Sequence, residues 1–139
     1  MKKGTLINSE LSHAVARLGH NDGLCICDAG LPIPDETRRI DLAVSKGIPS
    51  FMDTVKAVFS EMTVEAVEMA EEFPETSPDV HDAFLALLKE EEKAIGKEIR
   101  ILYVRHEAFK LATKRCRATV RTGEFTPYAN VILRAGVTF

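Results

Sequence analysis

The sequence lacks the features that mark several large classes of protein. It has only three cysteines, an odd number without the spacing of a disulfide scaffold, so free thiols in the cytosol are expected. No apolar run approaches the length of a membrane span, and the opening lysines are not followed by a signal-peptide core. The net charge is −3 and the basic residues are scattered, which leaves no electrostatic basis for binding nucleic acid or an anionic membrane.

Motifs for common cofactors are also missing. Neither GxGxxG nor GxxxxGK occurs, so nothing indicates a dinucleotide site or a P-loop. Cys25 and Cys27 would share one face of a strand, but a zinc site needs two more ligands, and no CxxC or HxxxH spacing supplies them. We therefore interpret these cysteines as small buried hydrophobic residues.

What is present predicts one α/β domain spanning residues 1–139. The composition, 45% hydrophobic and 28% charged, is that of a globular chain able to build its own core. Short apolar runs alternate with amphipathic stretches, as in layered α/β folds. Strands are expected at 24–27, 62–70, 98–104, 118–121 and 130–136. Residues 29–39 are expected to form a loop, because glycine and two prolines interrupt any regular element.

Four helices are expected between these strands. The first is capped by Ser9 and ended by Gly19, and a short one follows His106. The second is capped by Ser50 and turns Phe51, Val55, Val58 and Phe59 inward. The third opens at Ser77-Pro78 and turns Val80, Phe84, Leu87 and Leu88 inward.

Polar residues gather near the ends of these elements, and each has two interpretations. His20 follows a helix end, where it is either a proton carrier or, more commonly, a histidine bonded to the last carbonyls. Asp28 follows a buried strand, so it is either a ligand-binding carboxylate or a turn-initiating aspartate. His106 also follows a strand, and a place at the start of a helix is its alternative role.

Tyr128 and Asn130, in TPYANVIL, suit the hydroxyl groups of a sugar, or else form a turn anchored by proline. His13 and His81 fall inside expected helices and are interpreted as surface or packing residues. These observations predict polar side chains at strand ends, without naming a ligand.

The sequence as a whole resembles the RbsD/FucU family of sugar-ring isomerases. The resemblance spans the chain and is carried by MKKGTLIN, RLGHND, CDAGLPIP, RIDLAVSKGIPSF, RTGEFTPYAN and VILRAGVTF; it is weakest over residues 70–97. It implies a three-layer α/β/α fold with a mixed sheet. It also implies a ring-shaped homo-oligomer, typically a decamer, with sites at subunit boundaries and no metal or cofactor.

The activity implied by the resemblance is interconversion of the β-pyranose and β-furanose forms of D-ribose, a step that serves ribose catabolism. His20 matches the family's proton donor. Asp28, His106, Tyr128, Ala129 and Asn130 match its substrate-binding residues. Changing ring size needs only proton transfers, and histidine is suited to these because both of its protonation forms are available near neutrality. Two alternatives remain: a fucose mutarotase, and a non-catalytic ribose-binding accessory protein of a transport system.

Overall fold

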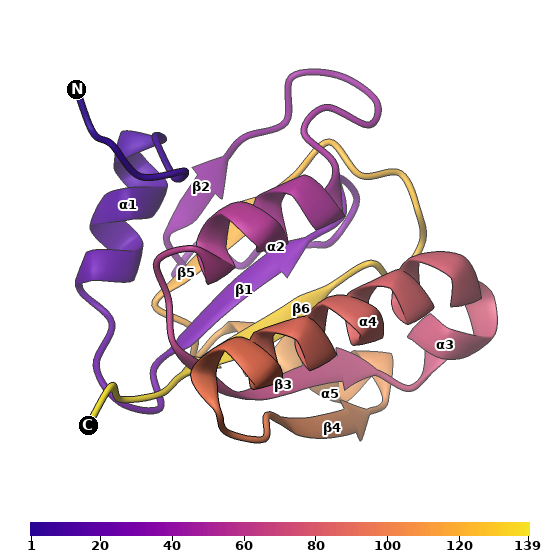
Figure 1. Ribbon diagram of the computed structural model, residues 1–139. Helices are drawn as coiled ribbons and strands as arrows, with labels where there is room; N and C mark the ends of the chain where they lie inside the picture. Colours follow the sequence, from indigo (N-terminus) through magenta and orange to yellow (C-terminus); the bar gives the residue numbers. More distant parts are fainter.

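Six strands form one mixed sheet at the centre of the molecule, as the computed structural model of residues 1–139 shows (Figure 1). In chain order they are β1 (Gly23–Cys27), β2 (Arg39–Asp41), β3 (Val64–Ala70), β4 (Arg100–Val104), β5 (Ala118–Arg121) and β6 (Val131–Ala135). Their order across the sheet is β2-β5-β1-β6-β3-β4. Only β6 runs against its neighbours, so strands β1 to β5 all end on the same side of the sheet. We call this side, formed by strand ends and not by an outermost strand, the carboxyl edge. The opposite edge is the amino edge.

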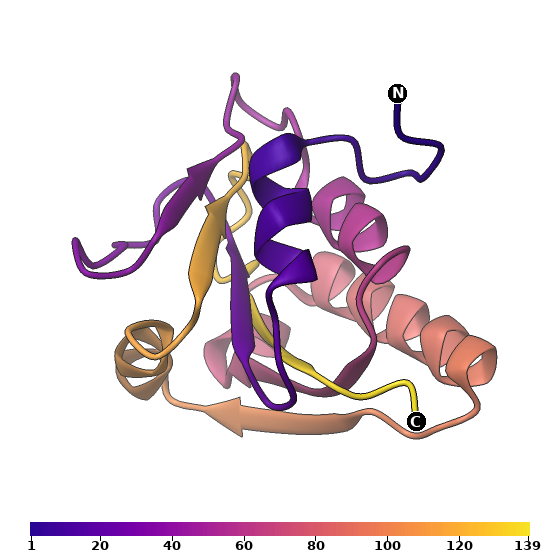
Figure 2. The ribbon, with the colours of Figure 1, turned by 90° about the vertical axis from the view of Figure 1, so that its left-hand side faces the viewer.

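Helices cover both faces of the sheet unequally. Three of them, α1 (Ser9–Ala16), α2 (Phe51–Phe59) and α4 (Pro78–Ile95), lie on one face, and α5 (His106–Thr113) covers the other (Figure 2). A short helix, α3 (Glu72–Thr76), joins β3 to α4. The three-helix face holds a core cluster of 24 buried residues, and the α5 face holds one of seven. The expected three-layer α/β/α fold with a mixed sheet is therefore confirmed. None of the helices combines the length and hydropathy needed to cross a bilayer.

The central strand β1 divides its side chains between the two cores. Leu24 and Ile26 face the three-helix layer, whereas Cys25 and Cys27 face α5. All five residues of the strand are buried, as expected for a continuous apolar run inside a sheet. The cysteines are unpaired and buried, so their interpretation as small hydrophobic residues is confirmed.

Most predicted elements are found, with a few corrections. The cap of α1 is Asn8, whose side chain accepts a hydrogen bond from the Leu11 amide at 2.9 Å, and not Ser9. Helix α1 also ends at Ala16 rather than at Gly19, which lies in the turn before β1. Helices α2 and α4 begin at the predicted residues, but the Ser77 hydroxyl does not cap α4, because it donates to the Pro127 carbonyl at 2.7 Å.

Two short elements are missed by the sequence patterns. Strand β2 has three residues, of which only Ile40 is buried, and its first residue falls in the expected loop. Helix α3 has five residues and one buried side chain, Phe73. Elements this short carry too little periodicity to be recognised. Strand β4 is where it is expected, but its five residues are exposed or half-buried because it is an edge strand.

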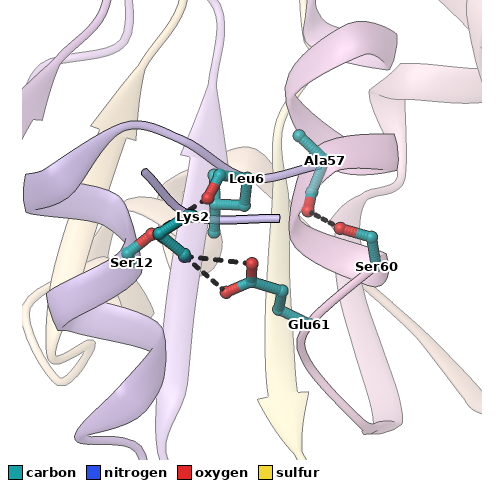
Figure 3. A network of polar contacts seen from close by, with 6 residues as sticks. All are labelled: Lys2, Leu6, Ser12, Ala57, Ser60 and Glu61. Atoms are coloured by element: carbon teal, nitrogen blue, oxygen red, sulfur yellow. Dashed lines mark hydrogen bonds and ion pairs between the residues drawn. The ribbon is translucent and has the colours of Figure 1, made fainter. Parts of the chain in front are cut away.

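The chain start is tied between two helices. The Lys2 ammonium donates to Ser12 in α1 at 2.7 Å and to the Glu61 carboxylate, just after α2, at 3.0 Å (Figure 3). The Ser12 hydroxyl in turn donates to the Leu6 carbonyl. Leu6 itself is buried in the larger core, so the segment before α1 is part of the packed structure.

Candidate functional site

The predicted site residues fall into two groups at opposite edges of the sheet. Asp28 and His106 directly follow strands that end at the carboxyl edge, and Asn130 directly precedes β6 at the same edge. His20 lies three residues before β1, at the amino edge. A five-residue strand such as β1 spans about 17 Å. A single monosaccharide therefore cannot touch His20 and Asp28 of the same chain.

The carboxyl edge holds a cavity of about 520 Å³. Polar groups in its wall include Asp28, His106, Tyr128, Arg121 and Glu124. The Leu31, Pro32 and Pro127 side chains supply part of the apolar surface. Apolar walls with a few convergent polar groups are typical of small-molecule sites.

Asp28 is held in the cavity wall by Asn130. The Asn130 side-chain amide donates to Asp28 Oδ2 at 2.9 Å, and its carbonyl oxygen accepts from the Asp28 amide at 2.8 Å. Asp28 Oδ1 accepts from the Gly30 amide at 2.9 Å, so the turn-initiating role of this aspartate is present as well. Each carboxylate oxygen has one protein donor and a free lone pair, which leaves both able to accept from a ligand hydroxyl.

His106 is the first residue of α5 and packs between two aromatic rings. It meets Tyr128 edge to face, with ring centroids 5.0 Å apart, and stacks on Phe109 at 6.4 Å. Its backbone amide donates to the Glu72 carboxylate at 3.1 Å. Its Nδ1 is buried without a hydrogen-bond partner. Because Nδ1 is buried, Nε2 is the ring nitrogen left to contact a ligand.

Tyr128 and its neighbours form a strained turn. Tyr128 has φ +63°, uncommon for a residue with a side chain, and its carbonyl accepts from the Asn130 amide at 2.7 Å. Ala129 is fully buried, and neither it nor Asn130 lines the cavity. Within one chain, Asn130 thus affects the cavity by orienting Asp28. Ala129 affects it only through the course of the backbone between Tyr128 and Asn130.

Glu124 and Arg121 belong to this cavity but were not singled out in the sequence. The Glu124 carboxylate accepts from the Phe51 amide at 3.1 Å and from the Thr126 hydroxyl at 2.7 Å, and also from the amides of Phe125 and Thr126. Burial raises the pKa of Glu124, but these hydrogen bonds outweigh it and hold the pKa below its usual value. Arg121 donates to the Ala29 carbonyl at 3.0 Å and pairs with Asp41 at 3.2 Å. In the sequence, the only signal is position: Arg121 is the last residue of the predicted strand 118–121, and Glu124 follows it by three residues.

At the amino edge, His20 is bonded to a carboxylate and not to the end of α1. Its Nε2 lies 2.9 Å from Glu65 Oε2, while more than half of its side chain is exposed. The alternative of a histidine bonded to the last helix carbonyls is therefore wrong. The turn around it is held by the Gly19 amide, which donates to Asp22 at 2.9 Å. That hydrogen bond lowers the pKa of Asp22. Burial raises this pKa, but the hydrogen bond and the positive charge of Arg117 lower it further.

The remaining histidines behave as packing or surface residues, as predicted. His13 is exposed on α1. His81 is buried, and its Nε2 lies 2.7 Å from the Tyr103 hydroxyl. The structure has no group of three or more His, Cys, Asp and Glu side chains placed to hold a metal ion.

Sequence comparison identifies the relatives of this chain. The sequence model of the RbsD / FucU transport protein family matches residues 1–138. This chain belongs to the RbsD/FucU family. A D-ribose pyranase of Photobacterium profundum is 61% identical over 139 residues, which is the whole of both chains.

Solved structures of the RbsD/FucU family share the fold described above. Bacillus subtilis RbsD complexed with D-ribose superposes with a TM-score of 0.90 at 45% identity, covering all of both chains. The fucose mutarotase of Streptococcus pneumoniae, in complex with L-fucose, gives a TM-score of 0.81 at 22% identity over 99% of each chain. At that identity the second match bears on the fold alone.

Proposed function

We propose that this chain is an isomerase that interconverts the β-pyranose and β-furanose forms of D-ribose. The observation that carries the proposal is the whole-length match to D-ribose pyranase in a chain whose carboxyl-edge cavity is built for a small polyol. In that cavity the Asp28 carboxylate accepts from sugar hydroxyls, and His106 Nε2 donates to a sugar oxygen. The Tyr128 ring and hydroxyl complete the wall.

The reaction exchanges protons and leaves the oxidation state of the sugar unchanged. The anomeric hydroxyl loses a proton as the ring oxygen gains one, and the ring opens to the aldehyde. Reclosure through the hydroxyl on C4 instead of C5 gives the furanose. His20 protonates the ring oxygen, and a positioned acid–base group of this kind typically contributes roughly 10²–10⁴-fold in rate.

His20 reaches the sugar from a second copy of the chain. Because β1 separates it from Asp28, the complete site combines the carboxyl edge of one subunit with the amino edge of its neighbour. Exposed apolar side chains in the loops at the carboxyl edge (Val44, Ile48 and Phe125) and on the outermost strand β4 (Leu102) support a homo-oligomer. For its size we propose the decamer that the family resemblance implies. Three buried free thiols support a cytoplasmic location.

Saturation-transfer NMR on D-ribose tests the proposal directly. Catalytic amounts of the protein should speed exchange between the pyranose and furanose signals above the rate in buffer. A protein that binds ribose without changing this exchange would be an accessory binder. Faster anomer exchange of fucose, with ribose unaffected, would indicate a mutarotase instead.

A further inference from the structure

Glu65 lies at an irregularity of the sheet that turns its side chain toward His20. In the β3–β6 pairing, Val64 is opposite Ala135 and Ala66 is opposite Arg134, so Glu65 is the extra residue of a β-bulge. A bulge bends its strand and redirects a side chain, and bulges are common beside active sites. The result is the 2.9 Å contact between Glu65 Oε2 and His20 Nε2.

The end of β6 connects this bulge to the turn that carries His20. The Ala135 carbonyl accepts from the Asn21 amide at 2.8 Å, and the Ala135 amide donates to the Asp22 carbonyl at 2.9 Å. Next along the chain, Gly136 passes so close to the bulge that an added Cβ would lie 3.3 Å from Glu65 Cβ. Ala135 thus bonds the turn directly after His20, and the next residue, Gly136, packs against Glu65.

The contact determines which nitrogen of His20 carries the proton. A carboxylate only accepts hydrogen bonds at neutral pH, so Nε2 must be the protonated nitrogen of the neutral ring. Nδ1 has no hydrogen-bond partner within the chain and is the atom left to exchange a proton with a ligand. The carboxylate also stabilises the imidazolium, as in other carboxylate–histidine pairs. This is the form that carries a proton on Nδ1, which His20 must hold before it can protonate the ring oxygen. Arg100, 3.7 Å from Glu65 Oε1, is a further charged group beside the pair, and Lys97 and Glu98 line the same hollow as Glu65.

We propose that Glu65 is the positioning residue of the catalytic histidine, and that His20 acts on the sugar through Nδ1. This inference rests on the proposed function, since it assigns the proton transfer to His20. Glu65 itself does not touch the sugar. It orients the imidazole, selects its neutral tautomer and faces the positive charge that the imidazole carries when Nδ1 is protonated.

Imidazole nitrogen NMR and kinetics of three variants test the proposal in the assembled protein. In the wild type, the nitrogen shifts of neutral His20 should report a proton on Nε2. Glu65→Ala should give a mixture of tautomers and lower the ribose exchange rate at saturation by about tenfold or more, because the acid–base contribution of roughly 10²–10⁴-fold depends on orientation. The ribose concentration at half-saturation should stay near that of the wild type. Glu65→Gln retains an acceptor for Nε2, so it should keep the tautomer and lose less activity than Glu65→Ala.

Glu61→Gln is the matched control. It removes one carboxylate that pairs with a cation, Lys2, and neither lines the cavity nor bonds His20, so exchange should match the wild type. A neutral wild-type His20 ring with its proton on Nδ1, or Glu65→Ala exchanging ribose at the wild-type rate, would overturn the role of Glu65. A wild-type protein that fails to speed exchange while His20 still shows the Nε2 proton would instead refute the proposed function alone.

Discussion

Asp28 and Asn130 hold each other by two hydrogen bonds across the carboxyl edge, 2.8 and 2.9 Å long, although 102 residues separate them in sequence. The pair joins the end of β1 to the start of the antiparallel strand β6, next to it in the sheet. Asn130 is almost fully buried, so it orients Asp28 from behind while the carboxylate faces the cavity.

Asn130→Ala should therefore weaken both the fold and ligand binding. Removing the amide leaves the Asp28 backbone N–H without its partner, which typically costs about 1–3 kcal/mol of unfolding free energy. The ribose affinity should fall too, because Asp28 loses its orientation. Urea unfolding and ribose titration measure the two effects. As a control, Asn8→Ala removes the cap of α1 and should cost about 1 kcal/mol without changing ribose affinity. Wild-type affinity in Asn130→Ala would contradict the orienting role.

His20→Ala and Asp28→Ala should each fold, assemble and lose ring exchange. The two variants should complement each other when they are mixed, unfolded and refolded together. Some interfaces then combine the intact amino edge of one chain with the intact carboxyl edge of the other, which restores a complete site. Saturation-transfer NMR on the mixture detects the recovered activity. Mixtures as inactive as the separate variants would place the whole site within one chain.

Glu124 should make the free energy of unfolding fall at acidic pH. Its folded pKa is held below the usual value near 4.5, so its contribution is fully present above pH 4.5. That contribution is lost as the pH falls through the folded pKa, because the unfolded chain then binds the proton more readily. Urea unfolding from neutral pH to below 4.5 measures the loss. Glu124→Gln should be less stable at neutral pH and should show a shallower acid dependence; an unchanged acid dependence would assign the effect to other carboxylates, such as Asp22.

Gly123→Ala should displace the loop that carries the cavity wall. A Cβ at residue 123 would lie 2.6 Å from the backbone nitrogen of Ile48 and against two backbone carbonyls, none of which can move as a side chain would. Overpacking of this kind costs about 1–3 kcal/mol, and ribose affinity should fall with it. Gly96→Ala is the control: its φ of +70° also disfavours alanine, at the end of α4 and away from the cavity. Its stability should fall while ribose affinity is kept.

The three cysteines should resist modification in the folded protein. Burial raises the pKa of Cys116 to about 12, and it raises that of Cys25 well above its ordinary value. Thiolates are the reactive form, so little reaction with a disulfide reagent is expected near neutral pH. All three thiols should react at once in concentrated guanidinium chloride. Rapid labelling of the native protein would show that the α5 core opens readily.

Much of the fold could be predicted because local signals and burial agree. The Ser50 cap and the four inward-facing apolar residues of α2 predict that helix, and the apolar run 24–27 predicts the central strand. Strand β4 marks the limit of such patterns. Its residues alternate as in a half-buried strand, but as the outermost strand it is covered only in part, and most of its residues are exposed. Burial depends on neighbours that the strand's own sequence does not specify.

By itself, the sequence determined the α/β class, most helix starts, and which polar residues stand at strand ends. Those are local properties, set by caps, prolines and the spacing of apolar side chains. Only the tertiary structure decided that Asn130 bonds Asp28, that Glu65 bonds His20, and that β1 separates the two pairs. Strand order and register bring these residues together across tens of positions in the chain. They depend on the packing of the entire sheet, which no short stretch of sequence contains.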